Sequence, residues 1–405
     1  LMLDRLIETE SPALQDKMQQ LGMALHTLMK RADTCLNEPV RNLEVVKRNS
    51  EENFTQTRAA IGSSLTLEAH ALMQRAVAHD LNELEELMRE RETQGYVRDG
   101  HGDLHAANIC MTEPICVYDC IEFNRRFRVA DIVADLAFLI MDLEFRGRKD
   151  LANILTTHYL NVSDDRNFEH LLPFYKQYRA WVRGKVDAML AVDPKTTEET
   201  REKAKKLATR YFNLALGYRL KPTLFLVSGL MGVGKTTLAR SLAQATGAKH
   251  LRSDVIRKQL AGVPEKQSCL DDFDRGLYSR EKTEQTYAAM FRSAEVAIAQ
   301  KHHLIVDASF AKEEESKRFM RLAEQTGYPV WLLALHCPEA VALARLDQRI
   351  GDVSDGRREL YANQKLNFRA AQESNHVVTI DTVQPVDYNV QSFLCRALSS
   401  QEQFA

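Results

Sequence analysis

An eight-residue run at 229–236 carries the residue types that bind phosphate. It reads Gly-Leu-Met-Gly-Val-Gly-Lys-Thr and fits the pattern G-x-x-x-x-G-K-[ST] at every fixed position. Glycines let the backbone turn tightly and point consecutive N–H groups at phosphate oxygens, and the following helix adds the positive end of its dipole. The run therefore predicts a nucleotide-binding loop made by Gly229, Leu230, Met231, Gly232, Val233, Gly234, Lys235, Thr236 and Thr237.

The loop also predicts where ATP and Mg²⁺ bind. Lys235 supplies a full positive charge for the β- and γ-phosphates, and we expect it to face solvent until the nucleotide arrives. The Thr236 hydroxyl is expected to bind Mg²⁺. Asp307 ends the apolar run 304–306 and is a second candidate for ordering Mg²⁺ or its waters, with a capping or turn role as the alternative.

Asp254 and Arg257 are candidates for chemistry on a phosphate acceptor. Asp254 follows the strand-like run 249–252, and in a doubly wound sheet the carboxyl ends of the strands line the ligand crevice. A carboxylate there can accept the proton of a hydroxyl that attacks the γ-phosphate. Arg257, one turn along, could hold an anionic part of the substrate. The alternative for Asp254 is that it only caps the helix over 255–260.

Two arginines mark a third candidate feature. Arg345 and Arg349 are four residues apart on the predicted helix 338–349, so they share a face. The following segment 351–358 has the composition of a flexible lid. Lid arginines would neutralise the charge that spreads over a transferred phosphoryl group, and solvated surface charge is the alternative.

A second run with catalytic residue types lies at 101–109 and reads His-Gly-Asp-Leu-His-Ala-Ala-Asn-Ile. Asp103, followed five residues later by Asn108, matches the pair in a kinase catalytic loop, in which the Asp accepts the substrate proton and the Asn holds Mg²⁺. Asp119, at the end of an apolar run, is placed where a second metal-binding Asp would be. A zinc site built on the two histidines of the run is the alternative.

The elements that must position the second run are mostly helical. Apolar residues recur at helical spacing over 14–29 and 65–91, and again from 129 to about 220, with interruptions at Pro173 and at 193–200. Short strand-like runs at 108–111 and 115–119 flank the catalytic residue types.

The phosphate loop calls for a different architecture. Beyond Pro222, compact apolar strands alternate with amphipathic helices, which is typical of a parallel sheet with helices on both faces. The predicted strands cover 223–228, 249–252, 304–306, 330–336 and 377–380, and the predicted helices cover 278–300, 313–326 and 338–349. We therefore predict an α/β fold, with a doubly wound parallel sheet over 221–405 preceded by a mostly helical domain over 1–220.

The composition argues against a disordered or fibrous chain. The chain has 405 residues, with 44% apolar and 27% charged residues, which is ordinary globular composition. Lys plus Arg number 54 against 56 Asp plus Glu, giving a net charge of -2, so we expect neither nucleic acid nor a membrane as a partner. The seven cysteines show no C-x-x-C spacing and no signal peptide is visible, so we expect a cytoplasmic location. The motifs do not specify an oligomeric state.

The motifs beyond residue 221 resemble the small P-loop kinase group that includes gluconate kinase, chloramphenicol phosphotransferase, the kinase half of polynucleotide kinase and zeta-type toxins. The resemblance covers nearly all of this part and implies transfer of the ATP γ-phosphate to a hydroxyl of a small molecule. The matching positions are 229–236, Ser253-Asp254-x-x-Arg257-Lys258, 305–309, Arg345-x-x-x-Arg349 and 352–355.

The earlier part resembles the aminoglycoside phosphotransferase-like family, whose loop reads H-G-D-x-H-x-x-N. The matching segments are 101–109, 119–123, 128–131 and 135–139. Kinases of this shape also have an N-terminal lobe with a glycine-rich turn and a strand lysine. Only helical segments precede His101, so the resemblance is to the larger lobe alone. We expect either that the natural chain starts earlier or that this half has lost its nucleotide clamp, and that 1–220 is inactive or nearly so.

Two other functions remain open beside the small-molecule kinase. One is a nucleotide-dependent switch or ATPase with no acceptor, which would have no need of a substrate base such as Asp254. The other is a polynucleotide 5′-hydroxyl kinase or a nucleotide-sugar kinase of toxin type, which the absence of a basic excess disfavours.

Overall fold

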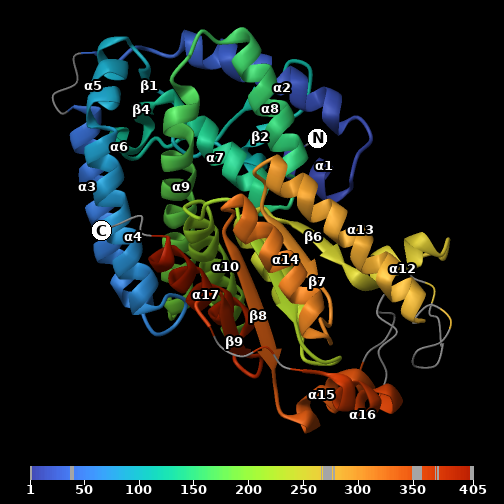
Figure 1. Ribbon diagram of the computed structural model, residues 1–405. Helices are drawn as coiled ribbons and strands as arrows, with labels where there is room; N and C mark the ends of the chain where they lie inside the picture. The colour runs from blue at the N-terminus through green and yellow to red at the C-terminus, as the bar shows by residue number, and fades with distance from the viewer. Residues whose placement is uncertain are drawn as a thin grey trace. The chain divides into compact units, whose positions relative to one another are not determined.

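The computed structural model describes residues 2–36, 41–265, 267, 276, 279–348, 358–369, 371 and 374–401. The chain forms two compact units (Figure 1). We call Leu1–Arg219 with Leu398–Ala405 the first unit, and Leu220–Ala397 the second unit. Each unit has its own secondary-structure class.

The first unit is mostly helical, as predicted. Two antiparallel pairs of short strands accompany the helices: β1 (Val97–Asp99) with β4 (Val129–Asp131), and β2 (Ile109–Cys110) with β3 (Cys116–Val117). The helical elements are α1 (Leu3–Glu8), α2 (Leu14–Arg31), α3 (Asn42–Thr57), η1 (Arg58–Ala60), α4 (Leu67–Glu83), α5 (Glu85–Thr93), η2 (Ala106–Asn108), α6 (Arg125–Arg128), α7 (Ile132–Phe145), α8 (Lys149–Val162), α9 (Phe168–Val192) and α10 (Glu198–Gly217).

Two sequence-based expectations for these helices were wrong. The periodic run at 65–91 forms two helices, because the chain breaks at Leu84 between α4 and α5. Pro173 does not interrupt α9 but lies inside its second turn. A proline this close to the helix N-terminus removes only one backbone hydrogen bond, so packing along the rest of α9 outweighs the loss.

A buried ion cluster ties α5 to strand β4 and to the loop before α9. The Arg91 side chain is fully buried, and its guanidinium donates to Asp131 (Nε to Oδ2, 2.7 Å) and to Asp165 (Nη2 to Oδ2, 2.8 Å). Asp131 also caps α7, since its Oδ1 accepts from the Val133 N–H at 2.9 Å. One guanidinium therefore bridges two buried carboxyl groups from different segments of the chain.

The second unit is built on a five-stranded parallel sheet. The strand order is β6 (Lys249–Arg252), β7 (Leu304–Asp307), β5 (Leu224–Ser228), β8 (Val330–His336) and β9 (Val377–Asp381). Its helices are α11 (Lys235–Thr246), α12 (Ser253–Leu260), α13 (Arg280–Ala299), α14 (Glu313–Thr326), α15 (Glu339–Asp347), α16 (Arg358–Asn367) and α17 (Val386–Ser400), the last of which ends in the first unit.

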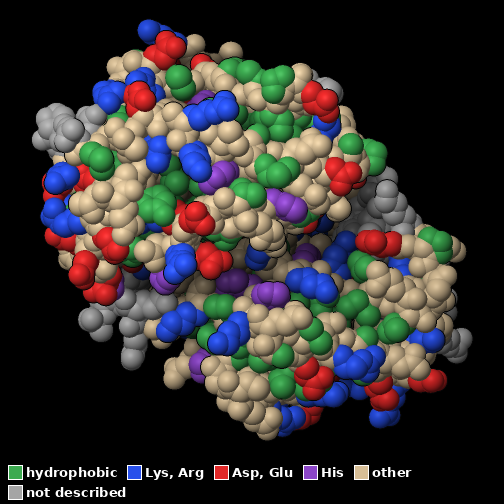
Figure 2. Space-filling model, turned by 90° about the horizontal axis from the view of Figure 1, so that it is seen from above, with side chains coloured by type: hydrophobic (Ala, Val, Ile, Leu, Met, Phe, Trp, Pro, Cys, Tyr) green, Lys and Arg blue, Asp and Glu red, His purple; other side chains and the backbone are tan. Residues whose placement is uncertain are grey.

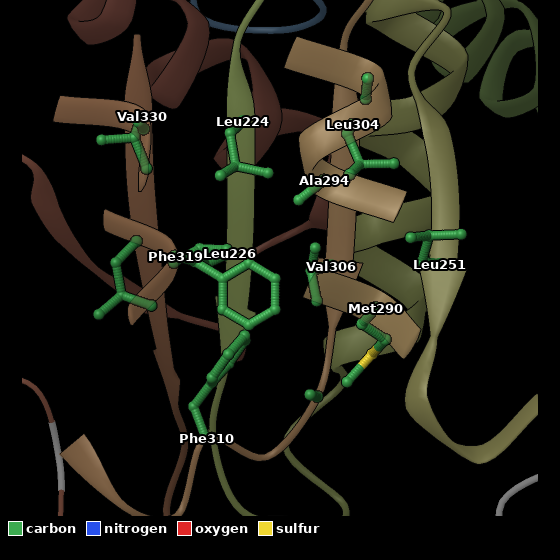
Figure 3. Close-up of a cluster of buried hydrophobic side chains, with 14 of the residues drawn as sticks. Leu224, Leu226, Leu251, Met290, Ala294, Leu304, Val306, Phe310, Phe319 and Val330 are labelled. Carbon is green, nitrogen blue, oxygen red and sulfur yellow. The ribbon is translucent and has the colours of Figure 1, made fainter. Parts of the chain in front are cut away.

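Helices cover both faces of this sheet. On one face, Leu226 and Val306 of the central strands pack with Met290 of α13 and Phe319 of α14 (Figure 3). On the other face, Phe393 of α17 packs against two strand residues, with ring centroids 5.9 Å from Phe225 and 5.7 Å from Trp331. The doubly wound α/β fold predicted from the alternating pattern is confirmed, although α16 and α17 were not predicted.

We expect Arg91→Leu to destabilise the first unit strongly. Leucine fills a similar volume but leaves the carboxylates of Asp131 and Asp165 buried without a counter-ion, which should cost about 3–5 kcal/mol of unfolding free energy. The chain has two tryptophans, Trp181 in the first unit and Trp331 in the second, so urea unfolding followed by fluorescence in a Trp331→Phe background monitors the first unit alone.

Arg5→Leu is the matched control for this experiment, because it removes an exposed Arg5–Glu8 pair from the same unit. Its effect should stay within about 1 kcal/mol. Equal shifts in the two variants would show that the buried cluster adds nothing beyond an ordinary surface ion pair.

Candidate active site

The phosphate-loop pattern occupies the turn between β5 and α11. Gly234 is the residue before the helix and has a left-handed backbone with φ of 94°. Gly232 also has a positive φ, 77°, and a Cβ at this position would lie 2.5 Å from the carbonyl oxygen of Ala342 on α15. The glycines are therefore required both by backbone conformation and by the close approach of a neighbouring helix.

Lys235 does not face solvent, contrary to expectation. Its side chain is half-buried, and its Nζ donates to the carbonyl oxygens of Gly229 at 2.9 Å and Leu230 at 2.8 Å. The ammonium group thus folds back over the loop to which it belongs, because the loop carbonyls are the acceptors within its reach.

Thr236 and Asp307 meet although they come from different elements. The Thr236 hydroxyl, on the first turn of α11, lies 2.8 Å from Oδ2 of Asp307 at the end of β7. His250 on β6 contacts the same carboxylate oxygen through Nε2 at 3.2 Å. Burial acts to raise the pKa of Asp307, but the hydrogen bond from His250 and the charge of Lys235 outweigh it and hold this pKa below its usual value. The carboxylate is therefore ionised at neutral pH and can serve as an oxygen ligand.

Helices from the end of the second unit brace the phosphate loop. The Met231 N–H donates to Oε1 of Gln364 on α16 at 2.8 Å. Arg345 on α15 donates to the Val233 carbonyl at 3.3 Å and to the backbone oxygen of Thr382 at 2.7 Å. Arg345 is thus a partly buried link between the loop and the segment after β9, which excludes the solvated-surface alternative.

Arg349 and the segment 351–357 lie outside the described residues. The expectation of an arginine-bearing lid there consequently stays a prediction.

Asp254 and Arg257 form an ion pair on α12. The Arg257 Nη1 lies 2.9 Å from the Asp254 Oδ1, and the Arg257 side chain is buried. The helix begins at Ser253 with Arg252 as its N-cap residue, so Asp254 lies inside the first turn. The alternative that Asp254 is the helix cap is therefore wrong.

One cavity joins the phosphate loop to this ion pair. It has a volume of about 970 Å³, and its lining includes Lys235, Thr236, Asp254, Arg257 and Asp307. The structure thus brings together the predicted nucleotide, metal and acceptor residues of the second unit. It can accommodate a phosphate chain at one end and a small molecule beside Asp254 at the other.

Sequence reasoning missed four residues of this site. His250 lies in a short strand of mixed polarity, in which the sequence pattern does not distinguish it from its neighbours. Gln364 lies on a helix that was not predicted. Tyr287 and Glu315 line the cavity from α13 and α14, where helical periodicity indicates only that they neighbour the core. Strand pairing alone would not have singled out His250, since the register places Arg252 opposite Asp307 and His250 opposite Ile305.

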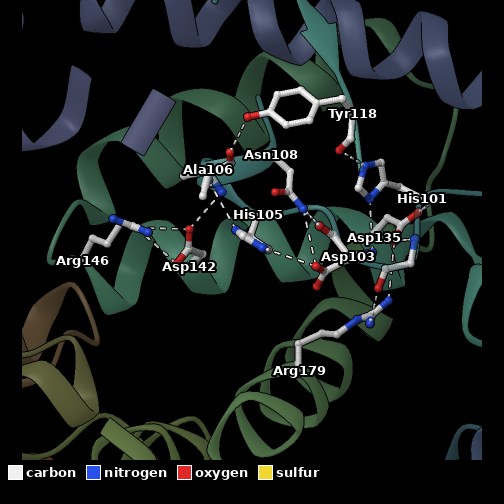
Figure 4. A network of polar contacts seen from close by, with 12 residues as sticks. His101, Asp103, His105, Ala106, Asn108, Tyr118, Asp135, Asp142, Arg146 and Arg179 are labelled. Atoms are coloured by element: carbon white, nitrogen blue, oxygen red, sulfur yellow. Dashed lines mark hydrogen bonds and ion pairs between the residues drawn. The ribbon is translucent and has the colours of Figure 1, made fainter. Parts of the chain in front are cut away.

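The predicted kinase-like loop of the first unit is held by a separate polar network (Figure 4). Asp135 of α7 accepts from the backbone N–H groups of His101 at 2.7 Å and Gly102 at 2.9 Å. Arg179 of α9 donates to the Gly102 carbonyl at 2.8 Å. These contacts fix the backbone on the N-terminal side of Asp103.

Asp103 and Asn108 lie close together within this loop. The Asn108 Nδ2 donates to the Asp103 carbonyl at 3.0 Å and lies 3.4 Å from its Oδ2, and the His105 Nε2 is also 3.4 Å from that oxygen. Burial acts to raise the pKa of Asp103, but the hydrogen bond with His105 and nearby arginine charges hold it below its usual value. Asp119 is exposed, with a left-handed backbone at φ of 65°, and is not part of the network drawn in Figure 4.

The zinc alternative for the two histidines has no support. The His101 Nδ1 accepts from the Asp103 N–H and its Nε2 contacts the Tyr118 carbonyl at 2.8 Å, while the His105 Nδ1 accepts from the Ala107 N–H. Within the described ranges, no group of three or more His, Cys, Asp or Glu side chains is placed to hold a metal ion.

Comparison with known proteins supports the P-loop part. Residues 224–371 match the family model for the AAA domain, a range that contains the phosphate loop, Asp254 and Asp307. The nucleotide-binding P-loop fold predicted for this part of the chain is thereby confirmed.

Two curated relatives are the uncharacterized proteins Mb2027c of Mycobacterium bovis and Rv2004c of Mycobacterium tuberculosis. Each is 30% identical over 321 residues, which make up 78% of this chain and 63% of the relative. The chain therefore spans less than two thirds of the length of the curated relatives it matches.

Solved structures also align with part of the chain. A gluconokinase from Sinorhizobium meliloti 1021 is 20% identical, with 45% of this chain and 97% of its own chain covered and a TM-score of 0.34. An APS kinase from Mycobacterium tuberculosis is 14% identical, with 44% of this chain and 98% of its own chain covered and a TM-score of 0.33.

Among the described residues, none of the helices has the length and apolar character needed to cross a membrane.

We expect Gly232→Ala to disrupt the phosphate loop. The added methyl group would meet the Ala342 carbonyl at 2.5 Å and would also strain a residue with positive φ, so both nucleotide affinity and the unfolding free energy of the second unit should fall. Urea unfolding followed by Trp331 fluorescence in a Trp181→Phe background, together with titration of a fluorescent ATP analogue, measures the two effects.

Gly327→Ala separates the clash from the strain. Gly327 has a similar φ of 63°, and a Cβ there would have nothing within 4 Å. It should lose about 1–2 kcal/mol through backbone strain while keeping full nucleotide affinity. If the nucleotide affinity of Gly232→Ala equalled that of Gly327→Ala, the close packing of α15 against the loop would not contribute to nucleotide binding.

Proposed function

We propose that the second unit is an ATP-dependent phosphotransferase that moves the γ-phosphate of ATP to a hydroxyl of a small molecule. The observation that carries this proposal is the shared cavity, in which the phosphate loop and the Asp254–Arg257 pair face one space of about 970 Å³. A nucleotide switch has no use for a carboxylate held beside that space, whereas a kinase needs one for its acceptor.

Asp254 is proposed as the group that receives the acceptor proton. The hydroxyl oxygen forms a bond to the γ-phosphorus while the bond from that phosphorus to the ADP oxygen breaks, and the hydroxyl proton passes to the Asp254 carboxylate. Arg257, 2.9 Å away, holds the carboxylate in place before transfer. Lys235 would exchange its two loop carbonyls for phosphate oxygens.

Thr236 and Asp307 fit a Mg²⁺ site. Their oxygens are already 2.8 Å apart, and Mg²⁺ prefers oxygen ligands, keeping waters and phosphate oxygens in its remaining positions. When bound, the ion would neutralise charge on the phosphate chain. The hydrogen bond from His250 and the charge of Lys235 keep the Asp307 carboxylate ionised. Asp307 and Thr236 would therefore offer the ion a charged and a neutral oxygen ligand.

The arginines have different proposed roles. Arg345 positions the loop through its contacts with Val233 and Thr382. Arg349 remains the proposed source of charge for the transferred phosphoryl group. On the face shown in Figure 2, basic and acidic side chains are interspersed. The chain as a whole has a net charge of -2 and no basic excess, which favours a small acceptor over a polynucleotide.

Asp254→Asn should separate nucleotide binding from phosphoryl transfer. The amide keeps the shape of the side chain but cannot take up the acceptor proton, so acceptor-stimulated ADP release should fall by about 10²–10⁴-fold while ATP affinity is retained. ADP release is measured with and without a panel of hydroxylated compounds. Lys235→Ala is the reference for loss of the nucleotide site and should abolish turnover with every acceptor.

The same assay discriminates the other functions. Turnover that is identical with and without acceptors, and unaffected by Asp254→Asn, would replace the kinase by an ATPase or switch. Stimulation by a 5′-hydroxyl oligonucleotide alone would indicate a polynucleotide kinase. Full ATP turnover in Lys235→Ala would overturn the whole assignment.

For the first unit we propose an aminoglycoside phosphotransferase-like larger lobe with little or no activity of its own. The support is that Asp103 and Asn108, the two residue types a kinase catalytic loop uses, lie close together, with the Asn108 Nδ2 3.0 Å from the Asp103 backbone carbonyl. Asp119 is exposed, which argues against a complete metal site.

Asp103→Ala in the full chain carrying Lys235→Ala tests this view. With the phosphate loop of the second unit disabled, any remaining transfer must come from elsewhere, and we expect neither variant to show measurable transfer above background. Residual activity in Lys235→Ala that disappears on adding Asp103→Ala would show instead that the first unit is an active kinase.

A further inference from the structure

Gln364 contacts the phosphate loop in the opposite sense to the cations around it. Lys235 and Arg345 donate to carbonyl oxygens of the loop. Gln364 instead uses its Oε1 as an acceptor for the Met231 N–H, with 2.8 Å between nitrogen and oxygen. The N–H groups of a phosphate loop are the groups that receive phosphate oxygens. The Gln364 oxygen therefore occupies a place that suits a phosphate oxygen.

The peptide group between Leu230 and Met231 indicates which phosphate this is. Its carbonyl oxygen accepts from the Lys235 Nζ at 2.8 Å, and its N–H is the group that donates to Gln364. The carbonyl and the N–H of a trans peptide point in opposite directions, so Lys235 and Gln364 hold one peptide from two sides. A phosphate-loop lysine reaches the β- and γ-phosphates. This peptide therefore lies beside the γ-phosphate end of the nucleotide site.

Helix α16 presents Gln364 to the cavity on a defined face. Leu360, Gln364 and Asn367 are spaced i, i+4 and i+7, and all three line the cavity that contains the phosphate loop. Tyr361 of the same helix is buried and packs against α15, beside which α16 lies in Figure 1. The helix backbone is thus held in place, while the flexible side chain of Gln364 can still turn its amide.

The side-chain amide of Gln364 has an acceptor end and a donor end. Because Met231 offers an N–H, the oxygen must be the atom that faces it, which fixes the orientation of the amide. The side chain is half-buried, and no residue that the structure describes accepts a hydrogen bond from its Nε2. The donor end is therefore available to a ligand in the cavity.

We propose that Gln364 binds the γ-phosphate and so favours triphosphate over diphosphate nucleotides. When ATP binds, a γ-phosphate oxygen takes over the Met231 N–H, and the Gln364 amide turns so that its Nε2 donates to the same phosphate. After transfer, ADP offers no partner to either group, and the Gln364 oxygen returns to the loop. This inference rests on the nucleotide site of the proposed function and adds to it a residue that favours ATP entry and ADP release.

A purely structural role for Gln364 makes a different prediction. A side chain that only braced the loop would support every nucleotide to the same degree, so its loss would weaken ATP and ADP binding equally. Glutamate at this position offers the same acceptor to the Met231 N–H and keeps the brace, but it has no N–H group to donate. The ratio of the dissociation constants of ADP and ATP therefore separates the two roles.

The test measures nucleotide binding in the absence of an acceptor. Displacement of a fluorescent ADP analogue from the full chain, in the presence of Mg²⁺, gives the Kd of ADP and the Kd of the β,γ-imido analogue of ATP. Gln364→Met keeps the length of the side chain but removes both polar ends. It should lower the ratio of these two constants at least about tenfold, because a hydrogen bond to a charged phosphate is lost. Gln364→Glu should lower the ratio as well, although it keeps the loop contact.

Asn363→Asp is the matched control for Gln364→Glu, because Asn363 is exposed on the same helix and lies outside the cavity lining. It adds the same charge one residue away and should leave both dissociation constants at wild-type values. Thermal unfolding of all three variants checks that each remains folded.

The outcomes distinguish this inference from the proposed function. A wild-type ratio in Gln364→Met would refute the role of Gln364 and leave the kinase proposal untouched, whatever happened to the absolute affinities. A wild-type ratio in Gln364→Glu would show that only the acceptor oxygen matters and would refute the donation to the phosphate. If the ratio fell as expected but no acceptor stimulated turnover, Gln364 would stand and the kinase proposal would fail. Absence of any nucleotide binding would overturn both.

Discussion

The contact between Thr236 and Asp307 is the constraint on which the second unit depends. It joins the first turn of α11 to the end of β7, and His250 extends it to β6, so three elements converge on one carboxylate oxygen. Parallel strands make this possible, because their carboxyl ends meet at one edge of the sheet. The burial of Asp307 would favour its neutral form, and the neighbouring donors and the charge of Lys235 reverse that preference. The Thr236–Asp307 pair proposed for Mg²⁺ is thus held together by contacts within the second unit.

Charge in both units is arranged in compensated groups. In the first unit Arg91 bridges two buried carboxyl groups, and in the second unit Arg257 is paired with Asp254 at the cavity wall. Pairing has a different consequence in each place. The fully buried cluster of the first unit can only contribute to folding. The pair at the cavity wall borders a space that a ligand can enter, so it can act on an incoming molecule as well.

Local pattern predicted much of this structure, and its failures have physical causes. The loop at 229–236 was predictable because its backbone conformation requires glycines and because Lys and Thr are the residue types that bind phosphate and Mg²⁺. Pro173 was expected to interrupt a helix, but its position near the N-terminus of α9 made it tolerable. His250 was missed because its importance comes from a neighbour distant in sequence, the Asp307 carboxylate at the end of β7. The catalytic roles of Asp254 and the other site residues remain predictions.

The folded-back Lys235 has a consequence for how the loop binds a nucleotide. Its ammonium group has two carbonyl partners, so a phosphate oxygen that binds it competes with these carbonyls. A triphosphate brings several charges and also meets the loop amides, so it can replace both bonds at once. Nucleotide binding would therefore release the lysine from its own loop.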